Sequence, residues 1–133
     1  MLSGAAVGAW SSKQKIVTKS STEAELVGLS DGASMVLWAR EFLLSQGHLL
    51  LPTVIGQDNQ GVLSLLDKGR HGNQRTKHLN IRYFFVKDRI ASGELTLVYV
   101  PTKHMIADIL TKPLMGALLI QLRGLLLGIT EAI

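Results

Sequence analysis

The chain has 133 residues, which is enough for one domain with a single hydrophobic core. It contains no cysteine, which excludes disulfides and thiolate metal sites, and no apolar run approaches the roughly 20 residues that span a bilayer. Hydrophobic residues make up 47% and charged residues 18%, a globular balance, and the formal net charge of +4 is compatible with a polyanionic partner.

The first part of the chain predicts two extended segments and then a long helix. AAVGAWSS and KIVTKSS are rich in β-branched or aromatic residues, which favour strands. The pairs Ser20–Glu23 and Thr22–Glu25 both have capping-box spacing, so either can begin the helix. Apolar residues then recur at helical spacing to about Ser45. Both tryptophans, Trp10 and Trp38, are expected in the core or on a sheet face.

The middle of the chain predicts strands and helices in alternation. A short apolar strand covers 53–57, and a helix follows from about 59 to 67. KGRHGNQRTK is polar, basic and punctuated by glycine, which is typical of a loop, and HLNIRYFFVKDRIAS predicts the next helix. ELTLVYV alternates well and is the clearest strand.

Beyond this strand, Thr102 can cap a helix that stops after Lys112, before Pro113. We expect residues 115–133 to be an amphipathic C-terminal tail. The order of the elements predicts the α/β class, with a mixed sheet flanked by helices. We expect residues 1–133 to form a single domain.

Three carboxylates lie where helix starts and a strand end could converge: Glu25, Asp58 and Asp108. Each also has a structural interpretation, as a capping-box partner, a helix N-cap and a residue favoured by the helix dipole, respectively. Clustered carboxylates repel unless a divalent cation lies between them, and oxygen ligands favour magnesium or manganese. Two such ions about 4 Å apart can support phosphodiester hydrolysis.

Four motifs in chain order resemble the RNase H domain of copia-type LTR retrotransposon polyproteins: STEAEL, QDNQG, RTKHLNIRYFFVKDRI and YVPTKHMIADILTKPL. The resemblance runs from about Trp10 to Leu114. It implies an RNase H-like fold and cleavage of the RNA strand of RNA–DNA hybrids with two magnesium (or manganese) ions. It also implies that Glu25, Asp58 and Asp108 are catalytic metal ligands, with Glu23 as the competing choice for the first.

The chain departs from this family at its beginning. The family's first catalytic aspartate lies on an upstream strand, whereas no acidic residue precedes Glu23 here. We therefore expect a fold that lacks its first one or two strands and a chain that cleaves poorly or not at all by itself. A partner, a homodimer or strand exchange could replace the missing strands. Asn80 stands where the family usually has an aspartate, and Phe84 where histidine is common.

A cluster of basic residues suits phosphate contacts, although a solvated surface loop would look the same. The candidates for nucleic-acid binding are Arg70, Arg75, Lys77, His78 and Arg82, joined by Asn59 and Gln60 beside Asp58. His104 precedes Asp108 and could move protons, or could be an ordinary surface histidine.

The resemblance implies an RNA–DNA hybrid and the reverse transcriptase portion of the polyprotein as partners, and no membrane. It implies an intracellular location, in the cytoplasm within virus-like particles or in the nucleus. The alternative function is a non-catalytic module that keeps the RNase H fold and binds nucleic acid or protein.

Overall fold

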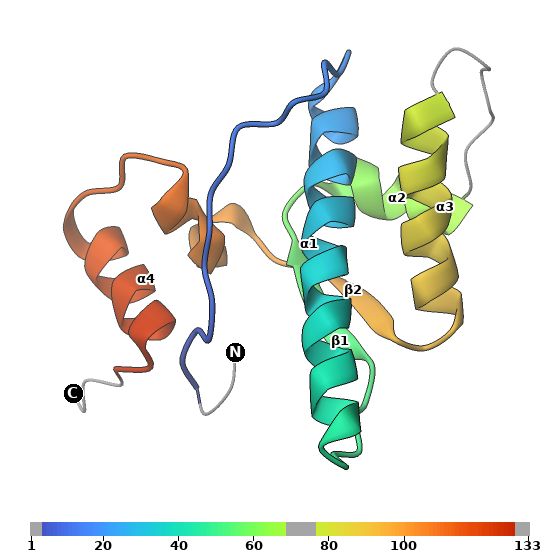
Figure 1. Ribbon diagram of the computed structural model, residues 1–133. Helices are drawn as coiled ribbons and strands as arrows, with labels where there is room; N and C mark the ends of the chain where they lie inside the picture. Colours follow the sequence, from blue (N-terminus) through green and yellow to red (C-terminus); the bar gives the residue numbers. More distant parts are fainter. Residues whose placement is uncertain (1–3, 69–76, 130–133) are drawn as a thin grey trace. The chain divides into compact units, whose positions relative to one another are not determined.

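The computed structural model describes residues 4–68 and 77–129 of the chain (Figure 1). Contacts divide the chain into two compact units, one of Gln14–Tyr99 and one of Met1–Lys13 with Val100–Ile133. That residues 1–133 form a single domain stays a prediction.

The unit of Gln14–Tyr99 combines three helices with a two-stranded parallel sheet (Figure 1). Its elements in chain order are α1 (Ser21–Ser45), β1 (Thr53–Gln57), α2 (Gln60–Lys68), α3 (Lys77–Ala91) and β2 (Leu95–Tyr99). Parallel strands need a crossover connection, which α2 and α3 provide. The predicted α/β class is therefore confirmed, and the small sheet with its helices is compatible with a truncated RNase H-like fold.

The core of this unit lies between the helices and one face of the sheet. Because side chains alternate along a strand, Ile55 and Leu97 pack against the helices, while Val54 and Val98 lie on the exposed face. The buried cluster consists of Leu26, Leu29, Val62, Leu66, Tyr83 and Val86. All three helices contribute to it, so the core holds α1, α2 and α3 against the sheet.

A buried arginine fastens the second half of α1 to the start of β1. Arg40 Nη1 donates to the carbonyl oxygen of Leu51 at 2.6 Å and to Thr53 Oγ1 at 2.8 Å. Buried donors need such partners, because an unpaired polar group in the interior costs stability. The loop between α1 and β1 is thereby tied to the helix that precedes it.

The turn between α3 and β2 is held by a second polar network. Glu94 accepts hydrogen bonds from Arg89 Nη1 at 3.0 Å and Ser92 Oγ at 2.9 Å. These bonds, that from Arg89 first, hold the pKa of Glu94 below its ordinary value of 4.5. The carbonyl oxygen of Glu94 accepts from the backbone N–H of Thr53 at 2.9 Å, which joins the turn to β1.

The other unit differs from the helix predicted after Pro101. It forms two short 3-10 helices, η2 (Thr102–His104) and η3 (Ile106–Leu110), separated by Met105 in an extended conformation. The predicted cap at Thr102 is wrong, because η2 begins at that residue and Pro101 occupies the N-cap position. The helix α4 (Gly116–Leu127) follows, with Leu122 buried.

The two segments predicted as extended near the N-terminus do not pair into a sheet. Residues 4–20 form no strand beyond an isolated bridge at Ala5. A strand requires a neighbouring backbone for its ladder of hydrogen bonds, and propensity alone does not supply one. Trp10 and Trp38 are exposed rather than in the core, Trp38 to 70%. Among the described residues, no helix is long and apolar enough to cross a membrane.

Candidate functional site

Glu23 and Glu25, the two alternatives for the first metal ligand, have different surroundings at the start of α1. Ser20 Oγ accepts from the backbone N–H of Glu23 at 3.2 Å, and Glu23 Oε2 accepts from the N–H of Lys19 at 2.8 Å. This reciprocal pair is a capping box, shifted by one residue on the glutamate side. Glu23 therefore serves the beginning of the helix. Glu25, two residues further on, has an exposed side chain.

At the end of β1, a residue other than Asp58 caps the next helix. Asn59 Oδ1 accepts from the N–H of Gly61 at 2.8 Å and from that of Val62 at 3.4 Å. The helix α2 begins at Gln60, so Asn59 is its N-cap and Asp58 lies between the strand and the cap. The cap interpretation of Asp58 is therefore corrected by one residue.

The start of α2 lies against the first turn of α1. A Cβ atom added at Gly61 would lie 2.8 Å from Thr22 Oγ1 and 2.9 Å from Asn59 Oδ1, closer than real Cβ atoms approach. Thr22 and Glu25 are three residues apart, so they share one side of α1. This contact brings the segments that carry Glu25 and Asp58 next to each other. Their carboxylate oxygens are the ligand type that magnesium prefers.

Filling this contact should be costly. Gly61→Ala places a methyl group against the stiff side chain of Thr22, so we expect a loss of about 1–2 kcal/mol in the free energy of unfolding. Gly32→Ala in α1 meets nothing within 4 Å and should instead stabilise by roughly 0.5–1 kcal/mol. Urea unfolding followed by circular dichroism measures both. Equal effects of the two variants would contradict the close approach of α1 and α2.

Asp108 belongs to the other unit, on η3, and its side chain is already paired. It is 9% exposed, and its Oδ2 lies 2.7 Å from Lys112 Nζ, one helical turn further along the chain. This ion pair compensates the carboxylate charge within the ADILTK motif. Its placement on a 3-10 helix replaces the α-helix that the sequence predicted.

Within either unit, the described residues include no group of three or more His, Asp or Glu side chains placed to hold a metal ion. The metal site of Glu25, Asp58 and Asp108 therefore stays a prediction, which rests on their carboxylate side chains. Two of its members come from adjacent segments of one unit.

The basic candidates have different surroundings. Lys77 and His78 are exposed at the start of α3, and Gln60 and His104 are exposed as well. Arg70 and Arg75 lie outside the described residues.

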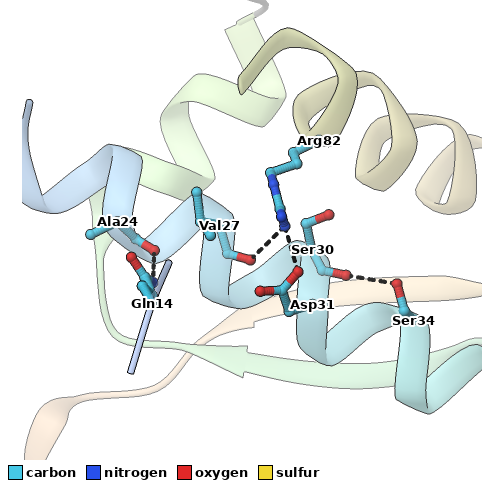
Figure 2. Close-up of polar contacts among 7 residues, drawn as sticks. All are labelled: Gln14, Ala24, Val27, Ser30, Asp31, Ser34 and Arg82. Atoms are coloured by element: carbon cyan, nitrogen blue, oxygen red, sulfur yellow. Dashed lines mark hydrogen bonds and ion pairs between the residues drawn. The ribbon is translucent and has the colours of Figure 1, made fainter. Parts of the chain in front are cut away.

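Arg82 joins α3 to α1 (Figure 2). Its Nη1 forms an ion pair with Asp31 Oδ1 and donates to the carbonyl oxygen of Val27 at 3.4 Å. The same view shows Gln14 Nε2 donating to the carbonyl oxygen of Ala24 at 2.7 Å. An open cleft of about 380 Å³ between α1 and α3 is lined by Arg82, Asp31, Ser34 and His78, among others. Arg82 thus links α3 to α1 in this structure.

Two residues of these networks were not singled out from the sequence. Asp31 lies 51 positions before Arg82, and no local pattern links them. Gln57 is buried at the end of β1, and its Oε1 accepts from the N–H of Asn59 at 3.0 Å. A signal for Gln57 does exist, because a polar residue at an inward strand position calls for a hydrogen-bond partner.

The chain is similar to segments of much longer proteins. It is 41% identical over 107 residues to the retrovirus-related Pol polyprotein from transposon RE1 of Arabidopsis thaliana, which covers 79% of this chain and 7% of the relative. It is 32% identical over 111 residues to that from transposon TNT 1-94 of Nicotiana tabacum, covering 83% of the chain and 8% of the relative. The Ty1-DR5 Gag-Pol polyprotein of Saccharomyces cerevisiae is 23% identical over 114 residues, or 86% of the chain and 6% of the relative.

No protein-family model matches the chain, and no solved structure matches it. The chain spans less than a tenth of the length of the relatives described above. The similarity to the plant polyproteins nevertheless extends over about four fifths of this chain, at up to 41% identity. The chain is therefore homologous to one segment of the retrovirus-related Pol polyproteins of transposons.

Proposed function

We propose that the chain forms part of an RNase H domain of a copia-type retrotransposon polyprotein, which cleaves the RNA strand of RNA–DNA hybrids. The observation that carries this proposal is the position of Asp58. It directly follows a parallel strand, at the edge where α/β proteins bind ligands, and the segment around it adjoins the turn of α1 that leads to Glu25. Homology to transposon Pol polyproteins supports it.

The proposed roles follow from the residue types. Glu25, Asp58 and Asp108 would hold two magnesium ions, which when bound activate water and stabilise the leaving oxygen. Lys77 and His78, exposed at the start of α3, would contact phosphates without reading sequence. Gln60, exposed on the first turn of α2, would contact the substrate backbone. His104 would take up or release a proton near Asp108.

A fourth carboxylate is needed to complete this site. The first 22 residues contain neither Asp nor Glu, so we propose that a partner of this chain supplies it. In a polyprotein, the reverse transcriptase portion is the natural neighbour, and a second copy of the chain is the other source. Three carboxylates by themselves would still bind a divalent ion, but they would not hold both reacting oxygens in the positions that hydrolysis needs.

A labelled RNA–DNA hybrid tests the proposal directly. We expect the chain to bind the hybrid with an affinity that falls steeply with salt, and to cleave it slowly or not at all in magnesium or manganese. Lys77→Gln should weaken binding and lower the salt slope by about 1, whereas Lys13→Gln, an exposed lysine of the other unit, should change little. Binding that ignores salt would contradict phosphate contact. Robust cleavage that disappears in Asp58→Asn would show that three carboxylates suffice.

One observation favours a second candidate, a binding module without chemistry. Asp108 is paired with Lys112 at 2.7 Å, so its charge is compensated without a metal ion. Such a module would keep the RNase H fold and bind nucleic acid through Lys77 and His78 of α3, but it would not hydrolyse it. The response of the chain to magnesium separates the two candidates.

A further inference from the structure

Gln57 occupies a position that strands usually give to apolar residues. It is the last residue of β1 and is 6% exposed, on the same side of the strand as Thr53 and Ile55. A buried amide is retained at a cost unless its polar atoms find partners. The side-chain oxygen of Gln57 finds its partner in the backbone N–H of Asn59, the residue after Asp58.

Two consecutive hydrogen bonds bracket Asp58. Gln57 Oε1 accepts from the N–H of Asn59 at 3.0 Å. The ring that this hydrogen bond closes includes the backbone of Asp58. Asn59 Oδ1 then accepts from the N–H of Gly61 at 2.8 Å, which ties the same backbone to α2. Gly61 in turn rests against Thr22 of α1. The backbone on both sides of Asp58 is thereby fixed relative to the helix that carries Glu25.

We propose that Gln57 is a positioning residue for Asp58. By holding the N–H of Asn59, it fixes the direction in which the Asp58 side chain leaves the backbone, and so the place of its carboxylate beside α1. This role rests on the proposed function, in which Asp58 is a metal ligand. An amide oxygen suits the task because it accepts a hydrogen bond without adding a second negative charge beside Asp58.

Amide hydrogen exchange and manganese binding on the full chain test this role. Gln57→Met keeps the length of the side chain and removes the acceptor, while Gln57→Glu keeps an acceptor oxygen. Gln121→Met, at an exposed position of α4, is the matched control. The probes are exchange at the Asn59 amide, exchange at the buried Leu26 amide as a reference for global opening, and the Kd of Mn²⁺ from calorimetry.

We expect exchange at Asn59 to become about 10-fold faster in Gln57→Met, with Leu26 and the control unchanged. The Kd of Mn²⁺ should rise at least about 10-fold, as for other residues that orient a metal ligand. Gln57→Glu should keep the Asn59 amide protected, because the acceptor rather than the bulk of the side chain matters.

Several results would overturn the role of Gln57. An unprotected Asn59 amide in the unmodified chain would do so even if no variant folded. Faster exchange at Asn59 with unchanged Mn²⁺ affinity would also do so, as would loss of protection in Gln57→Glu. If the unmodified chain bound no Mn²⁺, the proposed function would fail and this role with it. Mn²⁺ binding that is insensitive to Gln57→Met would reject the role alone.

Discussion

Replacing Asp58 by asparagine should remove the stabilisation that magnesium or manganese confers on the chain. A ligand that binds only the folded state stabilises it by about 2.7 kcal/mol at 100 times its Kd. Asparagine keeps the size of the side chain at the end of β1 but lacks the negative charge that a divalent ion requires. We therefore expect a metal-dependent rise in the midpoint of thermal unfolding in the unmodified chain and none in Asp58→Asn.

Asp67→Asn provides the matched control for this experiment. Asp67 is exposed near the end of α2, nine residues after Asp58, and removing its charge there should leave the response to metal intact. A shift that persists in Asp58→Asn would place the metal elsewhere. A chain whose unfolding is indifferent to metal would support the binding module, in which Asp108 remains paired with Lys112.

The largest loss of stability is expected for Leu26→Ala, at about 3 kcal/mol. Leu26 is fully buried in the cluster that joins α1 to α2 and α3, so the substitution removes apolar contacts and leaves a cavity. Leu49→Ala removes the same atoms from a side chain that is 100% exposed, and should change the free energy of unfolding by less than about 0.5 kcal/mol.

Urea unfolding of the two variants measures the difference between them. Leu26 directly follows Glu25, so the packing that Leu26 provides also holds the turn of α1 on which the candidate ligand lies. Similar losses in the free energy of unfolding for Leu26→Ala and Leu49→Ala would mean that Leu26 does not anchor α1 to α2 and α3. The proposed placement of Glu25 beside Asp58 would then lose its support.

Local patterns predicted most of the helices and strands closely. The apolar spacing and the cap at Ser20 place α1 at Ser21–Ser45, and the alternation of ELTLVYV corresponds to β2 at Leu95–Tyr99. These signals succeed because they involve residues within one or two turns, where the backbone geometry repeats. The same range of interaction explains why the capping box of Ser20 and Glu23 was readable, since its partners lie three residues apart.

Patterns failed where a segment depends on a distant partner. The first 20 residues have strand-like composition, yet no neighbouring strand pairs with residues 4–20 beyond the bridge at Ala5. Trp38 is exposed rather than in the core or on a sheet face, because its position on α1 faces away from the cluster of Leu26 and Leu29. The spacing of apolar residues predicts where a helix forms, but it does not say which other elements pack against each face of that helix.

The sequence by itself determined the chemistry available to this chain: three carboxylates in motifs that resemble an RNase H domain, no thiols and a net charge of +4. Only the tertiary structure decided that Asn59 rather than Asp58 caps α2, that Gln57 spans Asp58, and that Arg82 pairs with Asp31 across 51 positions. The physical reason is that hydrogen bonds and ion pairs depend on distances of about 3 Å. Such distances between separate elements arise only when a shared core brings them together.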